Sequence, residues 1–192
     1  MRLLLLLVAF PLLVAGASAQ SVGEFEMPDP PEGFTWQILP EIKAAFLLPD
    51  GWHYRAEDRS GTQAYFLTQQ DIATDGAFTT GLSINAVKDL PERANMSAVQ
   101  YAEAHAGLVP EMPGTEVQRT WGGVQGPLHS FGVRYRSSRP DGSAVVLHQV
   151  NVGNEETGTL YVLLFEAPEA EWDTAWESGE RVMSFYMLDI GV

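Results

Sequence analysis

Short apolar runs separated by turn residues make up most of the chain, and their length predicts strands. They are rich in aromatic and β-branched residues, and Gly, Pro, Asp or Asn interrupts the chain between them. The runs cover residues 35–39, 42–48, 52–56, 64–68, 78–87, 116–121, 128–137, 143–152 and 159–165. Parallel strand–helix–strand alternation is absent, so this order predicts an antiparallel, meandering sheet.

Helical periodicity appears in two segments. The first, residues 97–106, is rich in alanine, starts at Ser97 as predicted N-cap and is followed by Gly107 and Pro110. The second follows Pro168, where acidic residues occupy the first turn and interact favourably with the helix dipole. Its apolar residues recur at spacings of three and four: Trp172, Trp176, Gly179, Val182, Met183 and Tyr186.

The strand at residues 144–152 is apolar at consecutive rather than alternate positions. Such a pattern is typical of a sheet that is covered on both faces. We therefore predict an α+β fold in which helices cover an antiparallel β-sheet on both faces, an α/β/α sandwich.

The N-terminal segment predicts export. Arg2, an apolar run at residues 3–14 and the Ala17-x-Ala19 pattern are typical of a signal peptide over residues 1–19. The run is shorter than the roughly 20 residues of a membrane-spanning helix. Residues 20–33 are rich in proline and acids and predict a flexible leader, so residues 34–192 form the single predicted domain. The expected location is periplasmic or secreted, with cleavage near Ala19.

Charge and cysteine content restrict the classes of function and of covalent attachment that the chain can have. The net charge is −14, with 25 acidic and 11 basic residues, and it becomes −15 when cleavage removes Arg2. Such acidity repels phosphate backbones and disfavours nucleic-acid binding. The chain contains no cysteine, which excludes disulfides and a cysteine-linked lipid anchor.

The stretch FLLPDGWHYR places Asp50 close to His53, as a catalytic pair would require. However, Pro-Asp-Gly returns at residues 140–142 with no histidine after it, again between two predicted strands. A repeated Pro-Asp-Gly favours a hairpin turn in both places. We therefore predict no catalytic residue.

His129 and His148 lie on the two strands of the second predicted hairpin. If Arg139 pairs with Ser143, position 148 faces position 134. If Ser138 pairs with Ser143 instead, position 148 faces position 133. In either register His129 lies four or five residues further along, roughly 13–17 Å away, too far for one zinc ion. We predict no metal-binding or cofactor-binding residue.

Three arginines form the most suggestive charged feature. Arg134 and Arg136 share one strand face, Arg139 follows, and Phe131, Val133 and Tyr135 occupy the other face. One interpretation is internal pairing with acids. The other is a patch for an anion or an acidic partner.

Three stretches together resemble the PsbP-like superfamily, which also includes Ran-binding nuclear import proteins. They are FLLPDGWHYR, AYFLTQQDIATDGAFTTGLSINA and FEAPEAEWDTAWESGERVMSF. The similar features are a strand ending in Pro-x-Gly-Trp, a middle helix, and a last strand followed by proline and a Trp-bearing helix. The resemblance spans residues 34–188 and implies an antiparallel sheet between helices. It also implies an assembly or binding subunit rather than an enzyme.

We therefore predict an exported, non-enzymatic binding or assembly module that acts through protein–protein contacts, with an unidentified protein partner. The alternative is a carrier of a small or lipid-like ligand in a pocket between helix and sheet. Trp121 and Tyr135 are the aromatic residues expected to line such a pocket.

Overall fold

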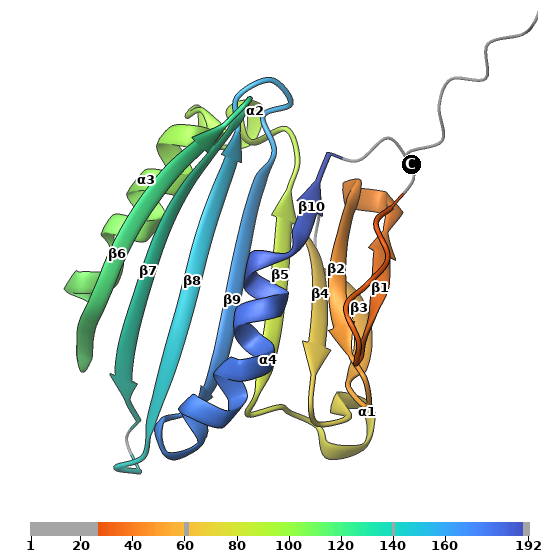
Figure 1. The fold of residues 1–192 in the computed structure, drawn as a ribbon. Coiled ribbons are helices and arrows are strands. Elements are labelled where there is room, and N and C mark those ends of the chain that lie inside the picture. The colour runs from red at the N-terminus through yellow and green to blue at the C-terminus, as the bar shows by residue number, and fades with distance from the viewer. Residues whose placement is uncertain (1–26, 60–61, 140, 190–192) are drawn as a thin grey trace, which may run out of the picture.

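The computed structural model describes residues 27–59, 62–139 and 141–189, and within them the strands form two antiparallel sheets (Figure 1). The predicted signal peptide at residues 1–19 and most of the leader lie outside the described residues. No helix in the described part of the chain has the length and apolar composition needed to cross a bilayer.

The larger sheet has seven strands in the order β3-β4-β5-β9-β8-β7-β6. Its strands are β3 (His53–Arg59), β4 (Thr62–Thr68), β5 (Gly81–Val87), β6 (Thr115–Gln125), β7 (Leu128–Ser138), β8 (Ala144–Asn154) and β9 (Leu160–Pro168). Each pair of neighbours is antiparallel, as the sequence predicts. Strands β6 and β3 form the two edges of this sheet.

The smaller sheet has three strands in the order β1 (Phe34–Leu39), β2 (Ala44–Pro49) and β10 (Tyr186–Leu188). The turn at Asp50 leads from β2 into β3, which belongs to the larger sheet. Trp52 N–H donates to the Pro49 carbonyl at 3.1 Å and Gly51 has φ 78°. The first Pro-Asp-Gly is therefore a turn, but the prediction that it forms a hairpin is wrong, because the chain changes sheet there.

The two predicted helices are α3 (Ala98–Gly107) and α4 (Trp172–Ser184). Ser97 caps α3 as predicted, in a reciprocal capping box with Gln100. Helix α4 ends at Ser184, and Tyr186 begins β10 instead, so the last residue of the predicted apolar stripe lies outside the helix. The shorter helical segments are η1 (Pro40–Ile42), α1 (Ile72–Asp75), α2 (Leu90–Ala94), η2 (Val109–Glu111) and η3 (Glu169–Glu171).

Different elements cover the two faces of the larger sheet. Helix α3 packs on β7, β8 and β9 at one face, while α4 packs on β9 and β2 at the other (Figure 1). The predicted α+β class with an antiparallel sheet is confirmed. The predicted sandwich is too simple, because the helices cover only part of each face and the smaller sheet shares the α4 face.

The main core lies between α4, the smaller sheet and the larger sheet. Phe46 of β2, Phe165 of β9 and Val182 of α4 are fully buried within it. A smaller cluster on the α3 face contains Val133 and Tyr135. The main core holds α4 against β9 and β2, and the candidate site lies beside it on the α4 face of the larger sheet.

Candidate functional site

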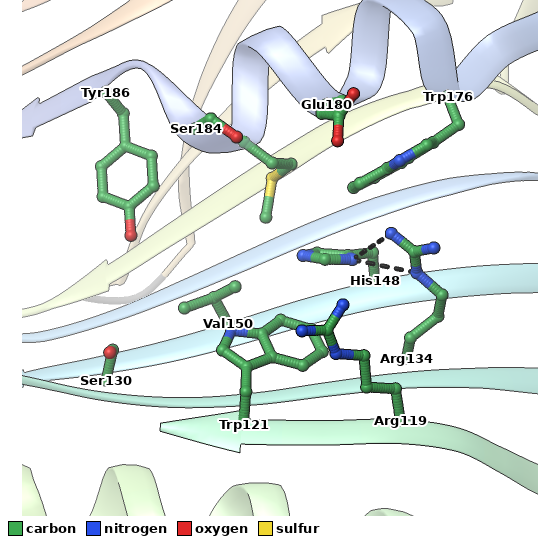
Figure 2. Close-up of a pocket in the computed structure, with 11 residues that line it drawn as sticks. Arg119, Trp121, Ser130, Arg134, His148, Val150, Trp176, Glu180, Ser184 and Tyr186 are labelled. Carbon is green, nitrogen blue, oxygen red and sulfur yellow. Dashed lines mark hydrogen bonds between the residues drawn. The ribbon is translucent and has the colours of Figure 1, made fainter. Parts of the chain in front are cut away.

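A cavity of about 270 Å³ lies between α4 and the strands β6, β7 and β8 (Figure 2). We call it the arginine cavity. Strand β6 contributes Arg119 and Trp121, β7 contributes Arg134, β8 contributes His148, and α4 contributes Trp176 and Glu180.

The guanidinium of Arg134 is held in place by its neighbours. Nε and Nη2 both lie within hydrogen-bonding distance of Nδ1 of His148, at 3.2 and 3.0 Å. The same guanidinium stacks over Trp176 at 4.1 Å and Trp172 at 5.2 Å from the ring centres. Cation–π contacts with two indoles orient this cation without neutralising its charge.

The imidazole of His148 lies between two indole rings. The ring centres of Trp121 and Trp176 are each 4.5 Å from that of His148. Burial, with the charges of Arg134 and Arg119, lowers the pKa of His148 to about 3. At neutral pH the ring is therefore uncharged, and because Nδ1 accepts from Arg134, its proton is on Nε2. Nε2 is thus a hydrogen-bond donor on the side of the ring away from Arg134 (Figure 2).

A β-bulge directs Arg119 into the arginine cavity. The register of β6 against β7 shifts between Val117 and Arg119, so that Val117 pairs with Tyr135 and Arg119 with Arg134. Val117 and Arg119 therefore belong to opposite faces, although a regular strand would place them on the same face.

The bulge sets two arginines directly opposite each other. Burial and the charge of Arg119 lower the pKa of Arg134, and the nearby carboxylate of Glu180 partly opposes this effect. None of the ion pairs between described side chains includes Arg119 or Arg134. Glu180 is exposed and lines the cavity without pairing with either.

Trp121 reaches His148 because its strand partner is a glycine. Trp121 pairs with Gly132 on β7 and its indole lies over the glycine backbone. A Cβ atom at position 132 would lie 2.0 Å from Cε2 of Trp121, closer than any real contact. Gly132 therefore provides the space for this wall of the cavity.

The sequence-predicted site residues occupy different places. Arg134 and Trp121 line the arginine cavity. Arg136 donates to Glu169 at 2.7 Å, the internal pairing left open above, and Arg139 is exposed beyond the end of β7. Tyr135 is buried on the α3 face and does not line this cavity.

Sequence reasoning missed Arg119, His148 and Trp176 as parts of one site. The predicted register of the hairpin between β7 and β8 did indicate that Arg134 faces His148. Arg139 N–H donates to Ser143 at 2.8 Å and Arg134 pairs with His148, which confirms the first of the two predicted registers. The bulge before Arg119 left no recognisable pattern in the sequence.

The remaining histidines lie apart from the cavity. His129 contacts Glu155 at 3.4 Å, and His105 lies 3.1 Å from Asn151 on the α3 face. His53 is exposed at the start of β3. Within the described ranges, no three acidic or histidine side chains come together as a metal site.

Comparison with known proteins relates the chain to others by fold. No family model and no curated protein sequence matches it. Among solved structures, LpqN of Mycobacterium tuberculosis, involved in cell envelope biogenesis, is 14% identical with a TM-score of 0.52, over 76% of this chain and 83% of LpqN. The cyanobacterial PsbP (CyanoP) of Synechocystis sp. PCC 6803 is 13% identical with a TM-score of 0.51, over 88% and 98%.

These two likenesses show that the chain has a PsbP-like fold, as the resemblance in the sequence implied. The Ran-binding protein Mog1p of Saccharomyces cerevisiae is also similar, at 14% identity and a TM-score of 0.45 over 82% of this chain and 96% of Mog1p.

Proposed function

We propose that this protein is an exported, non-enzymatic binding protein that binds an anionic group in the arginine cavity. The observation that carries the proposal is the cross-strand pair of Arg119 and Arg134, which has no ion-pair partner among the described side chains. This arrangement favours the predicted alternative, a ligand carrier with a pocket between helix and sheet.

The arginine pair is costly without a ligand. Like charges directly opposite each other on paired strands destabilise a sheet. Acids outnumber bases by 25 to 11 in the chain, so carboxylates are plentiful, yet none in the described ranges forms an ion pair with either arginine. A bound carboxylate or phosphate would relieve the repulsion and accept charge-assisted hydrogen bonds.

The groups around His148 support binding rather than catalysis. Its Nδ1 is occupied by Arg134, and no described hydrogen bond connects the ring to a serine or a carboxylate. A general base needs an available nitrogen and a pKa near the working pH. His148, with a pKa of about 3, is instead suited to donate a neutral hydrogen bond from Nε2.

The proposal can be tested by tryptophan fluorescence, since Trp121 and Trp176 line the cavity. The protein is titrated at low ionic strength with inorganic phosphate, acetate, benzoate and decanoate. We expect saturable binding of at least one of these anions, weakened about tenfold or more by Arg119→Gln and by Arg134→Gln.

Arg139→Gln is the matched control, because Arg139 is an exposed arginine that does not line the cavity. It should leave affinity unchanged beyond the general effect of charge. Equal weakening by all three substitutions, or no saturable binding of any anion, would reject the proposed site.

A protein partner is the second candidate, and the free edge of β6 favours it. This strand ends the larger sheet, and it exposes Val117 and Val124. An exposed edge strand can pair with a strand of another chain. A photoreactive residue at position 124 should then crosslink to one protein in the organism's envelope fraction, and Val117→Pro should abolish that crosslink. Crosslinking that is unchanged by Val117→Pro would rule out strand pairing.

Export is supported by the N-terminal sequence and by the fold shared with LpqN, a protein involved in cell envelope biogenesis. The expected result is a mature chain outside the cytoplasm whose N-terminus, read by mass spectrometry, lies near Gln20. Recovery of the intact chain from the cytoplasmic fraction would contradict export.

A further inference from the structure

A second cavity of about 240 Å³ adjoins the arginine cavity, because Ser130 and Tyr186 line both. We call it the distal cavity. Its other walls include Val124, Leu128, Val152 and Leu188, and none of the described residues that line it is charged. The two cavities together form a path that is cationic at one end and apolar at the other.

Strand β8 shows how the path changes character. His148, Val150 and Val152 alternate with residues of the opposite face, so all three point to the α4 side. His148 and Val150 line the arginine cavity and Val152 lines the distal cavity. Val152 lies four positions after His148, which corresponds to roughly 13 Å along the strand.

The residues that α4 and β10 place over the two cavities change from polar to apolar in the same direction. Trp176 and Glu180 of α4 lie above the arginine cavity (Figure 2). Strand β10 contributes Tyr186 to both cavities and Leu188 to the distal cavity. Tyr186 stacks on Phe46 of the main core at 5.7 Å between ring centres. The boundary between the cavities is therefore anchored to packed core.

From this arrangement, and resting on the proposed anion site, we infer that the ligand is a single-chain amphiphile with an anionic head, such as an alkyl carboxylate. The head lies at Arg119 and Nε2 of His148, and the alkyl chain follows Val150 and Val152 past Leu128. The charge at one end and the apolar lining at the other match this occupant.

The size and charge of the path disfavour other ligands. Each cavity is smaller than the roughly 300–1,000 Å³ of typical pockets for drug-sized molecules, so a ligand of that size would not fit inside either one. A cationic amphiphile would bring its charge against Arg119 and Arg134. A hydrophilic anion would leave the distal cavity without apolar contacts.

The test is an alkyl carboxylate series, from acetate through butanoate, hexanoate and octanoate to decanoate, each titrated into the full mature chain by calorimetry. Burial of one methylene tightens Kd about fourfold, so each two-carbon step of the series should tighten Kd about fifteenfold until the chain fills the distal cavity. Decanol and decyltrimethylammonium are the matched ligands without the negative charge, and we expect both to bind at least tenfold more weakly than decanoate.

Two variants separate the two ends of the path. Arg119→Gln should weaken every carboxylate by a similar factor of about ten, because it removes only a contact with the head. Leu188→Asn should flatten the dependence on chain length while leaving acetate unaffected. Leu108→Asn changes an exposed leucine outside both cavities and should alter neither. A thermal melt of each variant reports whether it is folded.

The outcomes distinguish this inference from the proposed function. If phosphate or acetate binds as tightly as decanoate and depends on Arg119, the anion site stands and the amphiphile is overturned. If decanol matches decanoate and Arg119→Gln has no effect, both are overturned. Stepwise tightening that Leu188→Asn removes supports the amphiphile.

Discussion

His148 illustrates how a single residue acquires its character from its surroundings. The ring lies between Trp121 and Trp176 and beside two guanidinium groups, which together keep it uncharged. The neutral ring accepts a hydrogen bond from Arg134 and holds that guanidinium against the indole rings. The neutral histidine therefore serves to position the arginine.

The depressed pKa of His148 predicts a pH-dependent stability. The ordinary pKa of histidine is 6.5, so below this pH His148 is protonated in the unfolded chain. In the folded protein the ring stays neutral down to about pH 3. The free energy of unfolding should therefore fall as pH decreases through this window. Each pH unit contributes at most about 1.4 kcal/mol, so wild type should lose about 2 kcal/mol more than His148→Gln between pH 6.5 and about pH 4.5.

Urea unfolding of both proteins over this pH range provides the measurement. The comparison with His148→Gln removes the contributions of the many carboxylates, which both chains share. If the two stability curves run parallel, His148 is not the group responsible.

Among the elements, α4 depends most on close packing. A Cβ atom at Gly179 would lie 2.6 Å from Cζ of Phe165, and Phe165 is fully buried between Trp52, Trp172 and Trp176. The ring therefore has no room to move aside. Glycine at this position allows the helix to approach β9 closely enough to form the roof of the arginine cavity.

We therefore expect Gly179→Ala to displace α4 from the sheet. The overpacking should lower the free energy of unfolding by about 1–3 kcal/mol, despite the better helix propensity of alanine. Anion binding should weaken as well, because Trp176 and Glu180 move with the helix. Calorimetric unfolding and the fluorescence titration report the two effects.

Gly107 in α3 provides the matched control. A Cβ atom there meets nothing within 4 Å. Gly107→Ala should therefore be neutral or stabilise the protein by up to about 1 kcal/mol. Equal effects of the two substitutions would contradict the packing argument.

Element-scale predictions from the sequence succeeded where the signal was local. Ser97 caps α3 because a hydroxyl followed by Gln100 satisfies free N–H groups within one turn. They failed where distant contacts decided the outcome. Tyr186 continues the apolar spacing of α4, yet the chain leaves the helix and pairs with Phe46 of β2, which forms the smaller sheet.

In the whole molecule, Tyr161 connects the two sheets. From β9 of the larger sheet its hydroxyl lies 3.1 Å from the carbonyl oxygen of Ile42, just before β2, and 3.2 Å from Asp189, which follows β10. Burial and the charge of Asp189 raise the pKa of Tyr161, so the phenol stays protonated. The hydroxyl has one proton, so it donates to one of these acceptors at a time, and both lie at the end of the smaller sheet where β2 begins and β10 ends.

Tyr161→Phe should lower the free energy of unfolding by about 1–3 kcal/mol, because the buried carbonyl oxygen of Ile42 loses its donor. Tyr101→Phe is the control, since Tyr101 is exposed on α3. Urea unfolding of the three proteins measures the difference. A Tyr161→Phe variant as stable as Tyr101→Phe would show that the two sheets are held together without this hydroxyl.

The sequence by itself determined strands β1 to β9, the two longer helices, the antiparallel order and the α+β class, because apolar periodicity and capping residues act within a few positions. Only the tertiary structure decided the second sheet and the arginine cavity. The bulge sets Arg119 opposite Arg134, and the packing of α4 brings Trp176 to His148. Both depend on side chains far apart in the chain, whose packing decides where a strand bulges and where a helix docks.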